Sequence, residues 1–195
     1  LATVNGFVSH LSTSASGWVV YLFYPQTIRV DEDALERVSA LGLISPQGTQ
    51  YFLVNQQPGE DRFALKNDTI VWTSFSANPN QPPLKTSEIQ SHLASQQTEI
   101  YPQIITLDLE EQGWRFITQN RSTNLHPDIN GNGWIVWTEI EGPYSPYNLK
   151  IANARIMLWD GRKREISDQA TGWSQPKINN RGEIVWHNPA EGVVY

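Results

Sequence analysis

The feature that most restricts the fold of this chain is an internal repeat that ends each time in Ile-Val-Trp. Residues 126–137 and 175–186 align without a gap over twelve positions, seven of them identical, at a spacing of 49 residues. A third copy ends at Trp72, 65 residues before Trp137, once one residue is deleted. Self-similarity at a period of roughly 20 to 50 residues is typical of solenoids, propellers and other repeat architectures. We therefore expect one structural unit to recur along the chain.

Each copy has the composition of paired antiparallel strands. A turn rich in Asn and Gly leads into the Ile-Val-Trp segment, whose β-branched and aromatic side chains suit a pleated, mostly buried surface. Further strands are expected over 104–108 and 114–118 in one unit, and over 155–159 and 165–167 in the next. Three or four short strands in each repeat predict an all-β chain made of β-propeller blades.

About 16 extra residues separate the first clear copy from the second. We interpret residues 76–99 as a loop and helix insertion within a blade, because Ser87 and Gln90 form a capping box for a short helix over 88–96. The sequence thus predicts one short inserted helix in this region.

A second short helix is expected over 33–40, with Gly42 just beyond its end. It separates two weaker copies of the turn, at residues 17–21 and 44–52, which we interpret as related units.

The repeats resemble those of TolB-type, WD40-like β-propellers. The segments that show the resemblance are Pro127–Trp137 and Pro176–Trp186. The Ser-Pro and Gly of residues 44–48 and the strand and turn over 156–161 also match the family pattern. The resemblance implies a propeller fold and, for this family, protein or carbohydrate partners at the cell envelope more often than catalysis. It transfers no functional residue, because the family motif places a turn and a strand and occurs in proteins with different functions.

The number of blades is limited by the chain length. Propellers typically have four to eight blades, and 195 residues in units of about 49 allow at most four. Residues 1–195 are therefore interpreted as a single β-propeller domain or part of one, as a partial or a four-bladed ring. We favour a piece of a larger ring, which the rest of a larger propeller or another copy of the chain would complete.

Composition excludes several classes of partner. The formal net charge of −6 and the pI near 5.2 argue against nucleic-acid binding, which needs a dense positive surface. No apolar run approaches the roughly 18 residues of a membrane-spanning helix. The absence of cysteine excludes disulfides, thiolate metal sites and thiol nucleophiles. We expect no membrane span and no cofactor.

One segment formally matches the calcium loop of an EF-hand. The candidate ligands are Asp128, Asn130, Asn132 and Glu139. A strand-like segment follows over 134–140 where an EF-hand needs a helix, and the sister repeat carries Lys177, Asn179 and Arg181 at ligand positions. We favour a hairpin turn over a metal site.

No residue pattern supports catalysis. The four histidines lack metal-binding spacing, and no nucleophile elbow or phosphate-binding loop is present. The acidic run 31–33 lies at the start of a predicted helix, where negative charge is favourable. The acidic run 110–111 forms a predicted turn. The sequence predicts a protein that is not an enzyme.

The tryptophans remain as binding candidates. Trp72, Trp137 and Trp186 hold equivalent positions and are expected in the core between units. Four others lie near turns, where an exposed ring would anchor a partner: Trp18, Trp114, Trp134 and Trp173.

These observations favour a non-enzymatic propeller module that binds a protein partner at the bacterial envelope, in the periplasm, or outside the cell. Two alternatives remain open. One is a carbohydrate-binding, lectin-like propeller, and the other is an accessory propeller domain of a hydrolase whose catalytic part lies outside this chain.

Overall fold

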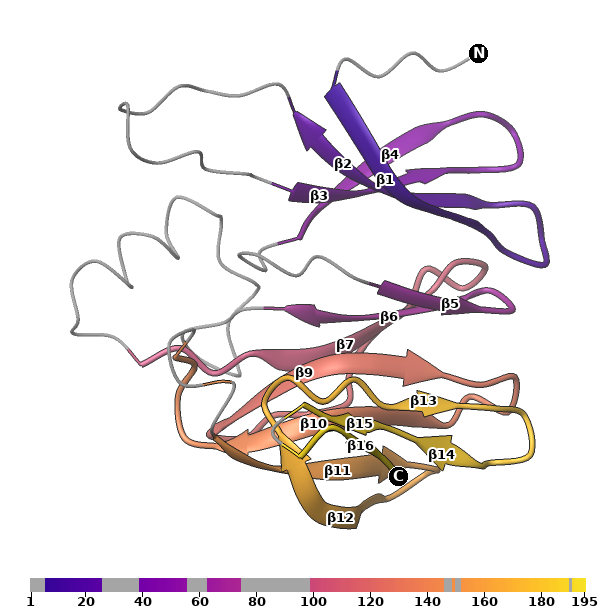
Figure 1. The fold of residues 1–195 in the computed structure, drawn as a ribbon. Coiled ribbons are helices and arrows are strands. Elements are labelled where there is room, and N and C mark those ends of the chain that lie inside the picture. The colour runs from indigo at the N-terminus through magenta and orange to yellow at the C-terminus, as the bar shows by residue number, and fades with distance from the viewer. Residues whose placement is uncertain are drawn as a thin grey trace, which may run out of the picture.

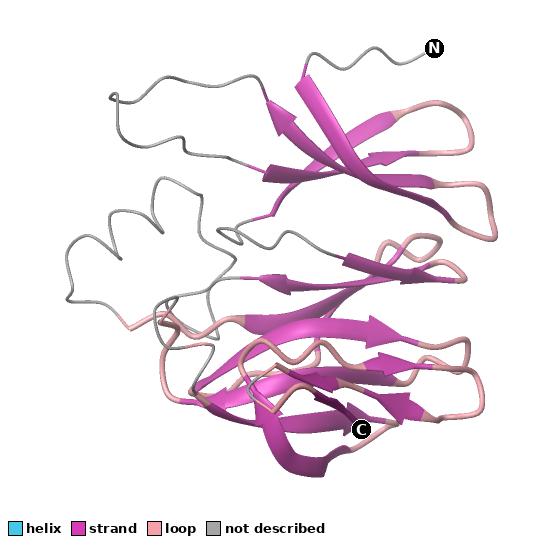
Figure 2. Ribbon diagram, viewed as in Figure 1, coloured by secondary structure: helices cyan, strands magenta, loops and turns pink. Residues whose placement is uncertain are grey.

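Every regular element that the structure describes is a β-strand (Figures 1 and 2). The computed structural model describes residues 6–25, 39–55, 63–74, 99–145, 149, 152–189 and 191–195. Over these residues the chain forms five antiparallel sheets and no helix. The all-β class expected from the repeats is therefore confirmed.

Three of the sheets have four strands each, and each strand pairs with the next along the chain. The first sheet holds β1 (Gly6–Thr13), β2 (Val19–Pro25), β3 (Ser39–Ile44) and β4 (Gln50–Asn55). The second holds β5 (Phe63–Lys66), β6 (Thr69–Ser74), β7 (Gln103–Asp108) and β8 (Trp114–Phe116). The third holds β9 (Ser122–Ile129), β10 (Ile135–Glu141), β11 (Asn153–Trp159) and β12 (Lys163–Thr171).

Two short hairpins follow the third sheet. They pair β13 (Lys177–Ile178) with β14 (Ile184–Val185), and β15 (His187–Asn188) with β16 (Val193–Val194). Together we call them the last unit. Figure 1 shows the sheets stacked in chain order, with the last unit beside the third sheet.

The Ile-Val-Trp strands explain why each sheet covers the next, because successive side chains of a strand point to opposite faces. Within residues 70–72, the Ile and Trp pack on the first sheet and the Val packs on the third. Within residues 135–137, the Ile and Trp pack on the second sheet and the Val faces the last unit. Each central strand thus contributes to two separate cores, one on each face of its sheet.

Turns at one end of the sheets are hydrogen-bonded from sheet to sheet. The Ala15 N–H donates to the Asn67 carbonyl at 3.2 Å, and the Asn67 side-chain amide donates to the Gly131 carbonyl at 3.3 Å. The Gly131 N–H then donates to Asn180 Oδ1 at 2.8 Å. These contacts, which we call the turn ladder, connect residues 14–17, 67–68, 130–133 and 179–182.

Two of these turns share one geometry, as the repeat predicts. The side-chain oxygen of Asn130 accepts the backbone N–H groups two and four residues ahead, both at 3.0 Å. Asn179 does the same at 2.9 and 3.1 Å. Gly133 and Gly182 end the two turns with φ of +77° and +83°, a conformation that other side chains rarely adopt. The expected Asn- and Gly-based hairpin turns are confirmed.

The helix predicted over 33–40 is wrong at its end, because residues 39 and 40 belong to β3; residues 33–38 lie outside the described part. Gly42 lies inside β3 opposite Tyr21, and a Cβ there would come within 2.2 Å of the Tyr21 ring. This glycine makes room for an aromatic ring on the neighbouring strand and does not end a helix.

The insertion predicted over 76–99, with its helix over 88–96, lies outside the described residues except for Glu99.

The two weaker repeat segments do not belong to separate units. Residues 14–17 join β1 to β2 and residues 45–48 join β3 to β4, so both turns lie in the first sheet. Ser14 and Ser45 accept backbone N–H groups from four residues ahead, each at 3.1 Å. A similar local motif therefore serves two different connections. No sheet in the described part of the chain closes into a ring.

Candidate functional site

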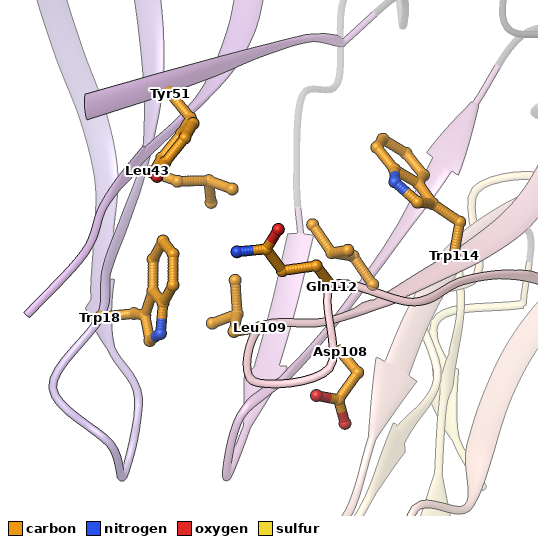
Figure 3. A pocket seen from close by; sticks show the side chains of 8 residues that line it. Trp18, Leu43, Tyr51, Asp108, Leu109, Gln112 and Trp114 are labelled. Carbon is orange, nitrogen blue, oxygen red and sulfur yellow. The ribbon is translucent and has the colours of Figure 1, made fainter. Parts of the chain in front are cut away.

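A cleft of about 160 Å³ opens between the first and second sheets, beside their turns. Its lining comes from both sheets and consists of Trp18, Leu43, Tyr51, Leu107, Asp108, Leu109, Gln112 and Trp114 (Figure 3). Two of the four tryptophans predicted to bind a partner, Trp18 and Trp114, therefore line one cleft.

The first sheet supplies an aromatic pair. Trp18 follows the 14–17 turn, and its backbone N–H donates to Ser14 Oγ. Its ring lies 6.0 Å from that of Tyr51 on β4, at an angle of 38°. Trp18 packs on the core between the sheets, whereas Tyr51 is 44% exposed. One wall of the cleft thus has a rigid, partly open aromatic surface.

The second sheet supplies Trp114 at the start of β8. Its ring meets Trp72 edge to face, with centroids 5.6 Å apart and planes at 71°. This contact holds the indole in place, yet 53% of Trp114 is exposed. A large apolar side chain that is both held and exposed is the usual form of an anchor for a partner.

The turn over 108–113 brings polar groups into the cleft. Asp108 Oδ1 accepts the N–H groups of Glu110 and Glu111, both at 2.9 Å, which fixes the loop. Gln112 has a φ of +54°, and Figure 3 shows its side chain directed toward Trp18. Within the described part of the chain, its amide makes no hydrogen bond, so donor and acceptor are both open to a ligand.

The lining is chemically suited to binding. Leucines and aromatic rings form most of it, and Asp108 is its one carboxylate. The lining includes no serine, threonine, cysteine, histidine or lysine. Apolar walls with few polar groups bind a ligand by burial and fix its orientation by hydrogen bonds.

The other two predicted tryptophans lie elsewhere. The Trp134 ring packs over Gly182, where a Cβ would come within 2.6 Å of it, so this residue joins the third sheet to the last unit. Trp173 lies between β12 and β13 and is 47% exposed. Only Trp173 therefore offers a further exposed indole, distant in sequence from the cleft.

The residues matched to a calcium loop serve structural contacts. The Asp128 carboxylate accepts hydrogen bonds from Lys177 Nζ at 3.1 Å and from the Ile178 N–H at 3.0 Å. The Asn130 amide donates to the Asn179 carbonyl, and Asn132 also donates to the next turn.

Glu139 lies apart from that turn, on β10. It is nearly buried and pairs with Arg155 at 2.8 Å, with Lys163, and with the Asn120 amide at 2.9 Å. Among the described residues, no group of three or more acidic or histidine side chains is placed to hold a metal ion.

One acidic group of the turn ladder titrates unusually. Hydrogen bonds from the Ser16 hydroxyl, the Ser16 N–H and the Ser14 hydroxyl hold the pKa of Asp68 below its ordinary value of 3.8. Asp68 is therefore ionised at neutral pH and connects the first two sheets beside the cleft.

Sequence reasoning missed most of the cleft. Tyr51, Leu107 and Gln112 lie on segments far apart in the chain, and only the stacking of two sheets brings them together. The acidic run at 110–111 was the one local sign of a turn at this place.

No protein-family profile matches the chain, and no curated protein matches it. In the part of the chain that the structure describes, no helix has the length and hydrophobicity needed to cross a membrane.

Proposed function

We propose that this chain is a non-enzymatic, propeller-type binding module that holds a segment of a protein partner in the cleft between its first two sheets. The observation that carries the proposal is the half-exposed Trp114, fixed against Trp72 at the mouth of an apolar cleft. Aromatic anchors in such positions dominate the energetics of many protein interfaces.

The shape of the site favours an extended peptide segment with an apolar side chain. Leu43, Leu107 and Leu109 would receive that side chain, and the rings of Trp18 and Trp114 would border it. The free amide of Gln112 can donate to and accept from a peptide backbone, which gives the segment a fixed direction.

The resemblance to TolB-type repeats supports the remaining parts of the proposal. The three four-stranded antiparallel sheets, in which each strand pairs with the next along the chain, support this part of the proposal, because propeller blades are four-stranded sheets. On the same resemblance we propose that the protein works at the bacterial envelope, in the periplasm or outside the cell.

A displayed peptide library screened against the purified chain tests this function. We expect selected peptides to share an aliphatic or aromatic residue. Trp114→Ala should weaken their binding at least tenfold, because truncation of an anchor costs about 2 kcal/mol or more. Trp173→Ala removes a similarly exposed indole outside the cleft and should leave binding unchanged.

Carbohydrate binding is the second candidate, and one observation favours it. Trp114 and Tyr51 expose ring surface beside the amide of Gln112 and the carboxylate of Asp108, a combination suited to stacking on a sugar and bonding its hydroxyls. A glycan array separates the two functions. Binding of glycans with no selected peptide, and loss of that binding in Trp114→Ala, would replace our proposal with this one.

A further inference from the structure

The boundary between the second and third sheets has residues that correspond, by strand register, to the lining of the cleft. In the first sheet, two steps of strand pairing lead from the completely buried valine of β2 through Leu43 to Tyr51. In the second sheet, the same two steps lead from the valine of β6 through Thr106 to Arg115. Arg115 therefore holds, toward the third sheet, the position from which Tyr51 lines the cleft.

The facing wall changes in the same way. Leu107 lies opposite the isoleucine of its Ile-Val-Trp strand and pairs with Trp114, and both residues line the cleft. In the third sheet, Trp159 lies opposite the equivalent isoleucine and pairs with Lys163. At this second boundary, two cations thus replace the two exposed aromatic residues of the cleft.

A ring contact holds the Arg115 side chain in place. Its guanidinium carbon lies 4.9 Å from the centroid of the Trp159 ring, which is itself partly buried against the third sheet. Arg115 is exposed, and its side chain makes no hydrogen bond and no ion pair within the described part of the chain. A guanidinium presents five N–H donors in a planar fork that fits a carboxylate. Arg115 is therefore a positioned anion binder whose donors are unused.

The other cations at this boundary already have acidic partners. The buried Glu139 carboxylate pairs with Arg155 at 2.8 Å and with Lys163. Glu165 lies 3.8 Å from the Arg155 guanidinium. Two carboxylates thus balance two of these three cations, and the charge of Arg115 is the one that no described acidic group balances.

We propose that the partner segment bound in the cleft carries an aspartate or glutamate, and that Arg115 binds its carboxylate. Trp114 and Arg115 are consecutive residues of β8, so their side chains point to opposite faces of the second sheet. β8 is an edge strand of that sheet. A segment that crosses this edge therefore reaches the cleft on one side of β8 and Arg115 on the other.

The spacing of the sheets sets the spacing of the two anchors in the partner. Stacked sheets lie about 10 Å apart, and an extended chain covers this distance in about three residues. The acidic residue should therefore lie about three positions from the apolar residue that enters the cleft. This inference rests on the proposed function, because it names the chemistry of the segment that the cleft holds.

Synthetic peptides selected from a random display library test the inference, with dissociation constants measured by fluorescence anisotropy. We expect the selected peptides to carry Asp or Glu about three positions from the apolar residue. Replacing that acid by its amide should weaken binding to the natural chain about three- to fivefold, the effect of a partly exposed ion pair. Arg115→Gln should bind the acidic and the amide peptide equally, because the carboxylate has lost its partner.

Arg181→Gln is the matched control, because it removes the same charge from an exposed arginine of the last unit. This variant should keep the full preference for the acidic peptide. Selected peptides without an acidic residue, or a preference that persists in Arg115→Gln, would overturn the inference and leave the peptide-binding proposal intact. If no peptide is selected, or if Trp114→Ala binds the selected peptides as well as the natural chain does, both proposals fail.

Discussion

At the scale of single residues, small side chains and short polar ones determine where the sheets approach. Gly42 leaves space for the Tyr21 ring, whose hydroxyl accepts a hydrogen bond from the Gln50 amide at 2.5 Å. The sequence motif around Gly42 suggested a helix end, because glycine is common there as well. Its role depends on a residue of the neighbouring strand, which no local pattern shows.

Gly42→Ala should destabilise the chain by about 1 to 3 kcal/mol, because the added methyl group would overlap the Tyr21 ring. Urea unfolding followed by tryptophan fluorescence measures the change. The double variant Gly42→Ala with Tyr21→Ala should show no further cost from the alanine, and a cost that persists without the ring would contradict this explanation.

The Asp68 carboxylate should make the free energy of unfolding depend on pH in the acid range. Its folded pKa is below the unfolded value, so its contribution is present above the unfolded pKa and is lost as pH falls through the folded pKa. Asp68→Asn should therefore be less stable than the natural chain at neutral pH, and the difference should disappear between about pH 5 and pH 2. Urea midpoints across this range measure it, and a difference independent of pH would argue against the ionised contact.

At the scale of elements, turns were predictable and contacts between sheets were not. The Asn and Gly positions of residues 130–133 and 179–182 define a hairpin turn locally, and the sequence predicted both. The cleft requires the turn at 108–113 to lie beside β4, and that placement results from packing between the sheets. The same packing gives the four residues matched to a calcium loop backbone, lysine, arginine and asparagine partners.

Two equivalent asparagines provide a test of the turn ladder. Asn130→Ala removes two hydrogen bonds within its own turn and one to the Asn179 carbonyl. Asn179→Ala removes the equivalent pair within its turn, but its amide bonds only to Glu183. Each substitution removes three hydrogen bonds, but the third bond of Asn130 is partly buried between two turns, whereas that of Asn179 is exposed to water. Asn130→Ala should therefore cost about 0.5 to 1.5 kcal/mol more, because a buried hydrogen bond contributes more than one that water replaces. Equal losses in chemical denaturation would mean that the contact between turns adds nothing.

At the scale of the whole molecule, the central claim is that copies of one strand cover one another in sequence, each with its Val toward the next sheet. The repeat in the sequence predicted the strands. It also predicted the burial of Trp72 and Trp137, which are 3% and 0% exposed. The prediction that Trp186 lies in the core holds only in part, because its ring is partly buried and stacks on that of Tyr195.

The free energies of unfolding of Val136→Ala and Val185→Ala, measured side by side, test that claim most directly. The two valines occupy the same place in aligned repeats, but one is buried between sheets and the other is exposed. We predict a loss of about 1 to 3 kcal/mol for Val136→Ala and a change within about 0.5 kcal/mol for Val185→Ala. Equal losses at the two positions would contradict the stacking of the repeats.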